Sequence, residues 1–253
     1  MNRINKLFNE KKQNILSLYF CAGHPTAGST ADIIRTLAAR GIDMLEIGIP
    51  FSDLMADGPV IQDAATKALR NGMSLHRLFE ELKDIRQDVE IPLILMGYLN
   101  PIFHYGFEAF CQSCADCGID GVIIPDLPFR DYMETFKPIA DRHGLKIIML
   151  ITPETSEERI RLIDRHTDGF IYMVSSAATT GAQKEFDRTK QAYFDRVNQM
   201  GLTHPRMIGF GISNRQTLES AQKACRRRHY RQPVRRPARP IRLGYGSPGQ
   251  TIR

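Results

Sequence analysis

Two carboxylates, Glu46 and Asp57, stand in a predicted strand and in the loop that follows it. Apolar residues alternate with Met44, Glu46 and Gly48, which is the two-residue period of a strand, so Glu46 lies on the face opposite the apolar one. Pro50 ends the strand, because proline cannot donate to a sheet ladder. Asp57 follows in a loop rich in Ser, Asp, Gly and Pro. Two carboxyls in different surroundings can hold different protonation states at one pH, so this pair could supply a general acid–base and a fixed hydrogen-bond acceptor.

A structural interpretation of the same two residues is a strand glutamate paired with an arginine and a loop aspartate that caps the next helix. The acid–base interpretation is favoured by the whole string of residues 45–62, L-E-I-G-I-P-F-S-D-x-x-A-D-G-P-x-I-Q. It resembles the signature of the tryptophan synthase alpha chain family. It departs from that signature at Leu54 and Met55, where the family usually has Pro and Leu. The resemblance extends from Ile15 to about Ala221.

Three further segments resemble the family, and each implies substrate contacts. The segment M-G-Y-L-N-P-I, residues 96–102, is similar to M-x-Y-x-N-P-I and implies that Tyr98 lines an indole pocket. Residues 172–181 are similar to Y-x-V-S-x-x-G-V-T-G, with departures at positions 178 and 179, and imply that Tyr172 lies near the substrate. Residues 209–213 match G-F-G-I-S. Exposed backbone N–H groups in such loops and at helix starts can hold phosphate. The substrate-binding residues implied by the resemblance are Tyr98, Tyr172, Thr180, Gly181, Phe210 and Gly211.

The resemblance also implies an activity. Members of the family cleave indole-3-glycerol phosphate by a retro-aldol reaction to indole and glyceraldehyde 3-phosphate, in L-tryptophan biosynthesis. Glu46 would then transfer the protons, and Asp57 would accept the indole N–H. This chemistry requires no metal and no organic cofactor in this chain; pyridoxal phosphate is expected only in the beta chain of an αββα heterotetramer. The segment Pro125-Asp126-Leu127-Pro128 implies a docking surface for that beta chain, although a turn with a capping aspartate is compatible with it.

Two other functions remain open at this stage. The first is a catalytically impaired alpha chain that only binds and activates the beta chain, because half of the expected phosphate site is missing. The second is another phosphate-binding barrel enzyme, such as an isomerase. The context of Glu46 and Asp57 argues against the second.

Predicted strands alternate with predicted helices at spacings of about 30 residues, the length of a βα unit. This pattern indicates a (β/α)₈ TIM barrel in which the eighth strand is absent, with a doubly wound sheet as the alternative. In a barrel the candidate residues, which follow strand ends, would share one face. The predicted strands are 15–22, 44–49, 91–96, 121–125, 146–151, 169–174 and 206–210. The predicted helices are 2–12, 30–40, 60–71, 74–86, 107–117, 132–143, 156–166, 187–200 and 214–224.

The carboxyl-terminal segment does not continue this pattern. The net charge of +6 comes from residues 222–253, which hold ten Lys or Arg and no Asp or Glu, whereas residues 1–221 carry a net charge of −4. Several prolines and the lack of an apolar period exclude a central strand there. When the reading frame of residues 224–234 is moved on by one base, the degenerate codons allow L-A-G-A-A-I-I-G-S-P-F, a sequence suited to the missing strand and phosphate turn. We therefore predict a barrel domain over 1–221 and a basic tail over 222–253 produced by a frameshift. A nucleic-acid-binding arm is the alternative.

The cysteines and the amino-terminal segment indicate the cellular compartment in which the protein is expected. Five cysteines, an odd number in a long chain without a secretion signal, argue against a disulfide framework. No apolar run approaches the ~20 residues that a bilayer span needs, and the first residues lack an apolar signal core. We expect a cytoplasmic protein. Cys111, Cys114 and Cys117 have a spacing similar to that of iron–sulfur ligands, but their helical period predicts packing of a helix against the barrel.

Overall fold

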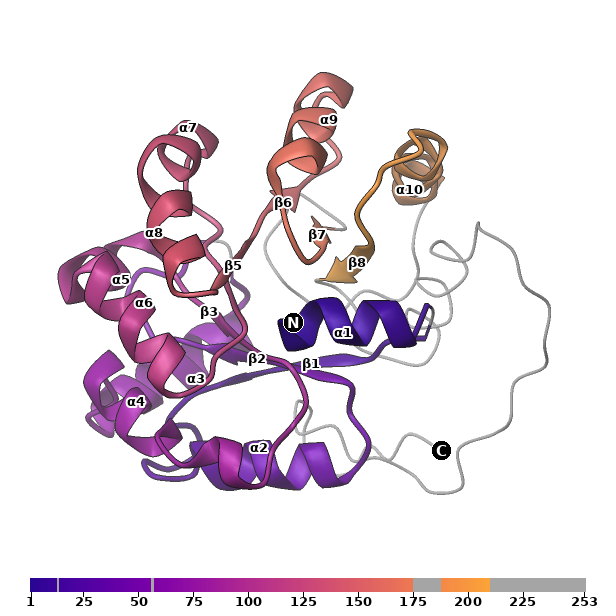
Figure 1. The fold of residues 1–253 in the computed structure, drawn as a ribbon. Coiled ribbons are helices and arrows are strands. Elements are labelled where there is room, and N and C mark those ends of the chain that lie inside the picture. Colours follow the sequence, from indigo (N-terminus) through magenta and orange to yellow (C-terminus); the bar gives the residue numbers. More distant parts are fainter. Residues whose placement is uncertain (13, 56, 175–187, 210–253) are drawn as a thin grey trace.

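Parallel strands form the inner layer of the fold, and helices form the outer layer (Figure 1). The structure is a computed structural model that describes residues 1–12, 14–55, 57–174 and 188–209. The strands are β1 (Ser17–Cys21), β2 (Met44–Gly48), β3 (Leu93–Met96), β4 (Gly121–Ile123), β5 (Lys146–Ile148), β6 (Leu150–Ile151), β7 (Ile171–Val174) and β8 (Arg206–Gly209).

Every strand pair in the described residues is parallel, as an α/β barrel requires. Strands β1 to β5 follow one another in one sheet, and β6 to β8 in another. Met149 alone separates β5 from β6, so the predicted strand 146–151 is divided at one residue. The predicted barrel architecture is confirmed. The region where an eighth strand would fall lies outside the described residues, so the absence of that strand stays a prediction.

Helices follow the strands along the chain. They are α1 (Arg3–Glu10), α2 (Thr30–Ala39), α3 (Pro59–Arg70), α4 (Leu75–Leu82), η1 (Ile85–Gln87), α5 (Leu99–Tyr105), α6 (Phe107–Asp116), α7 (Phe129–Asp131), η2 (Tyr132–Phe136), α8 (Lys137–Arg142), α9 (Glu157–His166) and α10 (Arg188–Gln199). Ser74 and Ser156, the first residues of the predicted helices 74–86 and 156–166, cap α4 and α9 with their side chains. None of the helices in the described ranges is long and apolar enough to cross a bilayer.

The sequence predicted neither the three-residue helix α7 nor helix α5. Pro101 lies within it, and a proline normally argues against a helix. Here the proline occupies the first turn of the helix, where a backbone N–H has no acceptor in the same helix, so its missing donor costs nothing. The predicted helix 214–224 lies outside the described residues.

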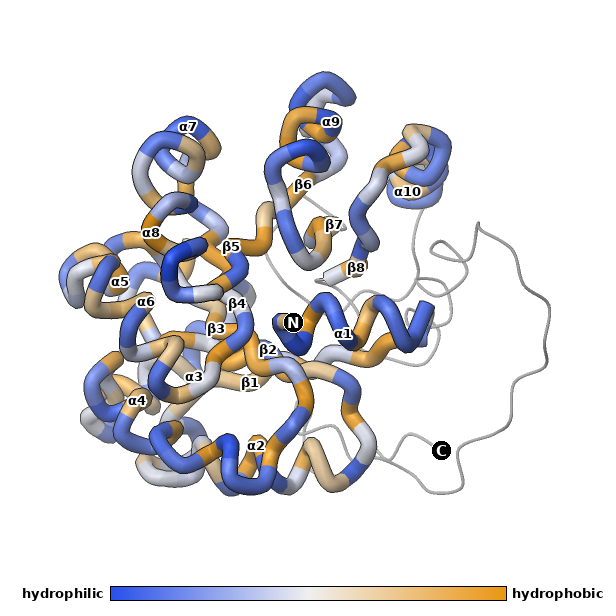
Figure 2. Tube along the Cα trace, in the orientation of Figure 1, coloured by the Kyte–Doolittle hydropathy of each residue, from blue (hydrophilic) through white to orange (hydrophobic). Residues whose placement is uncertain are grey.

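Alternation along the strands divides the apolar core into two layers. Residues on one face of the strands fill the barrel, and those on the other face pack against the helices. Figure 2 shows the strands as largely hydrophobic and the outer helices as mixed. The interior cluster consists of Ile4, Met44, Ile94, Met96, Ile123, Ile148, Phe170 and Tyr172. Ile4 belongs to α1, so this helix closes the interior at one end.

The three clustered cysteines belong to the outer layer. Cys111 and Cys114 on α6 are fully buried, and Cys117 follows directly. Burial raises the pKa of the Cys111 thiol to about 12, so this side chain stays protonated and packs as a small apolar group. The predicted packing role is confirmed.

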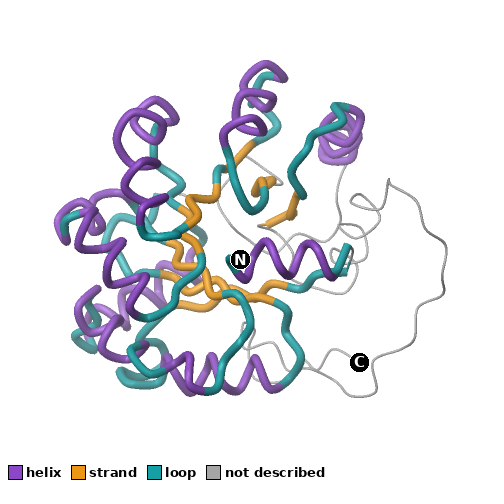
Figure 3. The backbone as a smooth tube through the Cα atoms, in the orientation of Figure 1, coloured by secondary structure: helices purple, strands orange, loops and turns teal. Residues whose placement is uncertain are grey.

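Helix α1 lies across the end of the barrel at which the strands begin (Figure 3). Its side chains reach residues that precede different strands, so one short helix connects several βα units. The Asn2 amide donates to the Asp120 and Gly144 carbonyls. Arg3 donates to the Asp120 carboxylate, and Asn5 donates to the Asp168 carboxylate. Lys11 donates to the Asp43 carboxylate.

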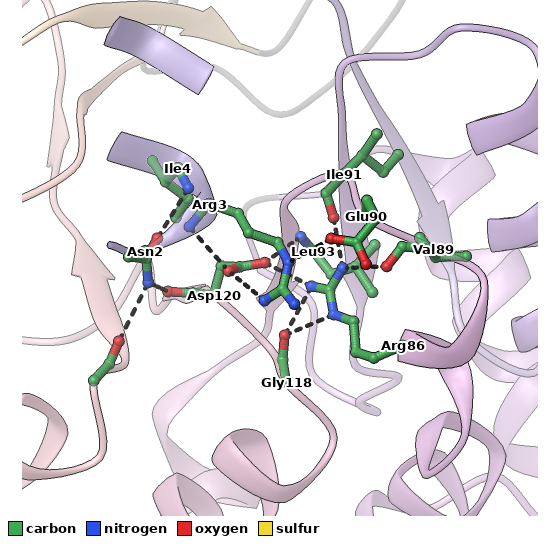
Figure 4. Close-up of polar contacts among 11 residues, drawn as sticks. Asn2, Arg3, Ile4, Arg86, Val89, Glu90, Ile91, Leu93, Gly118 and Asp120 are labelled. Carbon is green, nitrogen blue, oxygen red and sulfur yellow. Dashed lines mark hydrogen bonds and ion pairs between the residues drawn. The ribbon is translucent and has the colours of Figure 1, made fainter. Parts of the chain in front are cut away.

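The buried Asp120 carboxylate is the centre of this face (Figure 4). One of its oxygens accepts from the Arg86 guanidinium at 2.6 Å and from the Leu93 N–H at 3.0 Å. The other accepts from the Arg3 guanidinium at 3.3 Å. Arg86 also donates to the carbonyl of Gly118. Asp120 therefore joins the segments that lead into β3 and β4 to helix α1.

Substitution of Asp120 should destabilise the barrel strongly. Asp120→Ala leaves Arg86 buried without its carboxylate and the Leu93 N–H without its acceptor, which should cost about 3–5 kcal/mol. Asp63→Ala is a suitable control because it removes only the exposed ion pair with Lys67, and it should cost less than about 0.5 kcal/mol. Urea unfolding followed by circular dichroism measures both. Equal losses in the two variants would contradict the structural role of Asp120.

Candidate active site

Glu46 lies in β2 with its side chain directed into the barrel, and only 5% of the residue is exposed. The Ser17 hydroxyl, from β1, donates to Glu46 Oε1 at 2.7 Å. The Tyr172 hydroxyl, from β7, donates to Glu46 Oε2 at 3.1 Å. The two oxygens are thus held separately, one by the neighbouring strand β1 and the other by β7 of the second sheet. These partners are hydroxyls, so the arginine-paired glutamate of the structural interpretation is wrong.

Burial raises the pKa of Glu46 above its ordinary value, because the charged carboxylate loses its hydration inside the barrel. Hydrogen bonds from Ser17 and Tyr172 act in the opposite direction and are the smaller effects. A carboxyl with a raised pKa can hold a proton closer to neutral pH and can then release it. This is the property that a general acid–base needs.

Two glycines create space for tyrosine hydroxyls inside the barrel. A Cβ atom on Gly209 would lie 1.9 Å from the Tyr172 hydroxyl, and one on Gly48 would lie 2.1 Å from the Tyr19 hydroxyl. Any larger residue at either position would displace the tyrosine. Burial, followed by the charge of Glu46, raises the pKa of Tyr172 well above its ordinary value. Tyr172 therefore remains a hydrogen-bond donor to Glu46.

Asp57 follows β2 in a loop that hydrogen bonds fix at Leu54 and at Asp57. Its side chain accepts a hydrogen bond from the Tyr98 hydroxyl at 3.2 Å. The Gln62 amide donates to the backbone carbonyls of Leu54 and Asp57 at 3.1 and 2.9 Å. Gly58 occupies the N-cap position of α3, so the helix-capping role considered for Asp57 is wrong. Burial raises the pKa of Asp57, and the Tyr98 bond opposes that effect.

A hollow opens above Asp57 at the carboxyl ends of the neighbouring strands. Most of its lining is apolar or aromatic, and Asp57 is its one carboxylate. The composition of these walls matches an apolar ring that carries one polar donor, while the hollow itself, at about 10 Å³, has room for about one water molecule. The lining residues are Tyr19, Ile49, Leu54, Asp57, Met96, Gly97, Tyr98 and Pro125.

The structure brings the described candidates together in two pairs, Glu46 with Tyr172 and Asp57 with Tyr98. Asp57 and Tyr98 lie beyond the ends of β2 and β3, where the barrel prediction places a site, whereas Glu46 and Tyr172 lie within β2 and β7. The remaining candidates lie outside the described residues, so their roles stay predictions. They are Thr180, Gly181, Phe210 and Gly211.

Three neighbours of the site were not predicted from the sequence. Gln62 supports the Asp57 loop, and Ser17 and Tyr19 approach from β1. A signal for the latter two was present, because Ser17 and Tyr19 are the polar residues on one face of the predicted strand 15–22.

Asp126, in the P-D-L-P segment, accepts the Leu99 N–H at the start of α5 at 2.8 Å. This contact is the capping role that was considered for the segment, and a docking role remains a prediction. In the described part of the chain no group of three or more His, Cys, Asp or Glu side chains is arranged to hold a metal ion.

Comparison with known proteins gives one consistent result. A family model described as tryptophan synthase alpha chain matches residues 5–226. The tryptophan synthase alpha chain of Phocaeicola vulgatus is 69% identical over 221 residues, which cover 87% of this chain and 86% of the relative. That of Bacteroides thetaiotaomicron is 66% identical over 221 residues, with the same coverage of both chains.

Solved structures are similar as well. The tryptophan synthase alpha chain from Legionella pneumophila aligns with a TM-score of 0.74 at 36% identity, over 85% of this chain and 79% of that one. A chain of the tryptophan synthase complex from Pyrococcus furiosus aligns with a TM-score of 0.74 at 33% identity, over 83% of each chain.

The raised pKa of Glu46 predicts a pH-dependent effect on stability. The folded state holds this proton more tightly than the unfolded chain does, so stability falls as the pH rises from the ordinary carboxyl range through the raised pKa. Glu46→Gln does not titrate. Its unfolding free energy relative to the unchanged chain should therefore increase as the pH rises above the ordinary carboxyl range.

Urea unfolding at several pH values measures this difference. Glu134→Gln changes an exposed carboxyl on the surface and is the control, for which a small and nearly constant difference is expected. A pH-independent difference for Glu46→Gln would show that burial does not perturb Glu46.

Proposed function

This chain belongs to the tryptophan synthase alpha chain family, and from that premise we propose that Glu46 and Asp57 carry the family's lyase reaction. The reaction is the retro-aldol cleavage of indole-3-glycerol phosphate to indole and glyceraldehyde 3-phosphate in L-tryptophan biosynthesis. The observation that carries the assignment is a buried carboxyl with a raised pKa, placed inside the barrel near an aromatic hollow with a second carboxyl. The comparisons support a catalytic chain and give no support to one that only activates a partner.

In the proposed mechanism Glu46 transfers two protons in sequence. Its protonated carboxyl first donates to C3 of the indole ring, which makes the indole a good leaving group. The resulting carboxylate then removes the proton of the hydroxyl on the glycerol carbon attached to C3. The carbon–carbon bond breaks, its electron pair restores the indole ring, and the aldehyde forms. Glu46 ends in its protonated form, ready for the next turnover.

Asp57 stabilises the charge that develops during this reaction. Protonation at C3 places positive charge on the indole nitrogen, and a carboxylate that accepts the indole N–H lowers the energy of that state. The Tyr98 hydroxyl and the Gln62 amide hold Asp57 and its loop before the substrate arrives. A carboxylate fixed in advance avoids reorganisation during the chemical step.

Binding of the rest of the substrate is assigned from the motif matches. Tyr98 would line the indole pocket, and Tyr172 would help to place the substrate. Thr180, Gly181, Phe210 and Gly211 would hold the substrate, the glycines by letting backbone N–H groups approach the phosphate.

The proposed chemistry consists of proton transfers between carboxyls and substrate, so it calls for no metal or organic cofactor in this chain. Pyridoxal phosphate would belong to a beta chain, with which this chain would form an αββα heterotetramer. The likeness to a chain of the Pyrococcus furiosus tryptophan synthase complex supports such a partner. We place the protein in the cytoplasm. The four described cysteines are free thiols, which is usual in a reducing compartment.

We also propose that the barrel domain spans 1–221 and that residues 222–253 are a frameshift product. The family match ends at residue 226, close to the start of the basic tail, which supports this boundary. The tail would then replace the eighth strand and half of the phosphate site.

Glu46→Gln should lower indole release from indole-3-glycerol phosphate by about 10²–10⁴-fold, because the proton-transfer group is lost. Asp57→Asn should lower it by a similar factor, since a neutral amide stabilises positive charge poorly. Indole release by the purified chain, with and without a beta chain, measures both. Gln112→Ala, on the exposed surface of α6, is the control and should retain full activity. Full activity in Glu46→Gln would overturn the assignment.

Restoring the shifted frame after about residue 224 should increase indole release and lower the KM for the phosphorylated substrate, because the second half of the phosphate site returns. The measurement compares the given chain with the frame-restored chain under identical conditions. Sequencing the genomic DNA provides the independent check. A coding sequence without the out-of-frame peptide would contradict the frameshift.

A further inference from the structure

We propose that Ser17 is a positioning residue that orients Glu46 and accommodates both protonation states of its carboxyl during turnover. This inference rests on the proposed function, since it concerns how the same carboxyl is prepared for two proton transfers.

The position of Ser17 separates it from the substrate. In the strand register Ser17 pairs with Met44, and Tyr19 pairs with Glu46, so Ser17 lies one inward position nearer the start of the strands. Substrates of barrel enzymes bind at the opposite end, beyond the carboxyl ends of the strands. The Ser17 hydroxyl nevertheless reaches Glu46 Oε1 at 2.7 Å. Ser17 therefore contacts the Glu46 carboxyl from the side opposite the substrate and affects the reaction only through that carboxyl.

The geometry holds the carboxyl plane from two sides. Ser17 binds one oxygen, and the Tyr172 hydroxyl binds the other at 3.1 Å. With one partner on each oxygen, rotation of the carboxyl about its terminal bond would break both bonds. Loss of the Ser17 bond leaves one contact and permits that rotation.

A serine hydroxyl suits a group that changes its protonation state. It can donate to a carboxylate and, after rotating, accept from a carboxylic acid. In the mechanism above Glu46 passes through both forms in each turnover. Because the donated bond favours the ionised form and opposes the effect of burial, removal of the hydroxyl should raise the pKa of Glu46 further.

Few other titratable groups face Glu46 in the described residues. Tyr172 comes from β7, Tyr19 from β1, and Asp57 from the loop after β2. The apolar side chains that the other strands contribute to the interior cluster are Ile94, Met96, Ile123, Ile148, Leu150 and Met207. A substitution at Ser17 changes none of these groups, so a shift in the titration of Glu46 would report the lost hydroxyl.

The experiment compares Ser17→Ala with Ser17→Thr, which keeps a hydroxyl on a strand position that favours β-branched residues. The control is Ser113→Ala, which removes a partly buried hydroxyl that bonds Tyr105 far from Glu46 in the outer layer. Two readouts are used. One is the pH profile of kcat and kcat/KM for indole release, and the other is the ¹³C titration of glutamate carboxyls, with the Glu46 signal assigned by its absence in Glu46→Gln.

Ser17→Ala should lower kcat by about tenfold, the value of one hydrogen bond to a charged group, and should move the Glu46 titration and the corresponding limb of the profile to higher pH. Ser17→Thr and Ser113→Ala should have a kcat and a Glu46 titration close to those of the unchanged chain. An unmoved Glu46 titration in folded Ser17→Ala, or a shift in Ser17→Thr as large as in Ser17→Ala, would overturn the proposal. If neither the given chain nor the frame-restored chain releases indole, the proposed function fails, while the ¹³C titration still decides the role of Ser17.

Discussion

The buried Asp120 carboxylate is the interaction on which the order of the barrel depends. It binds the Arg86 guanidinium, the Leu93 N–H and Arg3, and so fixes the starts of two strands to helix α1. Asp43, which precedes β2, accepts the Leu16 N–H before β1 in the same way. A buried carboxylate requires several donors at once, because an unpaired charge in the interior is costly. Each such aspartate therefore admits one arrangement of the segments around it.

Stability and chemistry are separated along the barrel axis. At the end where the strands begin, aspartate carboxylates accept hydrogen bonds from arginine and lysine side chains and from backbone N–H groups. Further along, the donors to Glu46 within the described residues are hydroxyls, and burial raises its pKa. The rigid end keeps the strands in register, and this register brings Ser17 and Tyr172 to the two oxygens of one carboxyl. The cost of burying Glu46 is the physical source of its ability to transfer protons.

Much of the fold could be predicted from local patterns. The strands were found because their residues alternate or form short apolar runs, and Ser74 and Ser156 marked helix starts. Failures have physical causes. Helix α5 was not predicted because it is short and contains Pro101, a residue that helices tolerate in the first turn but not in their interior. The division at Met149 was missed because strand pairing, which no local pattern encodes, ends there.

The sequence by itself determined the family, the alternation of strands and helices, and the identity of Glu46, Asp57, Tyr98 and Tyr172 as candidates, because these depend on residue type and spacing along the chain. Only the tertiary structure decided which of them meet. Tyr172 reaches Glu46 across 126 positions of sequence, and Ser17 reaches it from another strand. Burial, which sets the pKa of Glu46, likewise arises only when the strands close around it, because desolvation is a property of the whole surrounding structure and not of neighbouring residues in sequence.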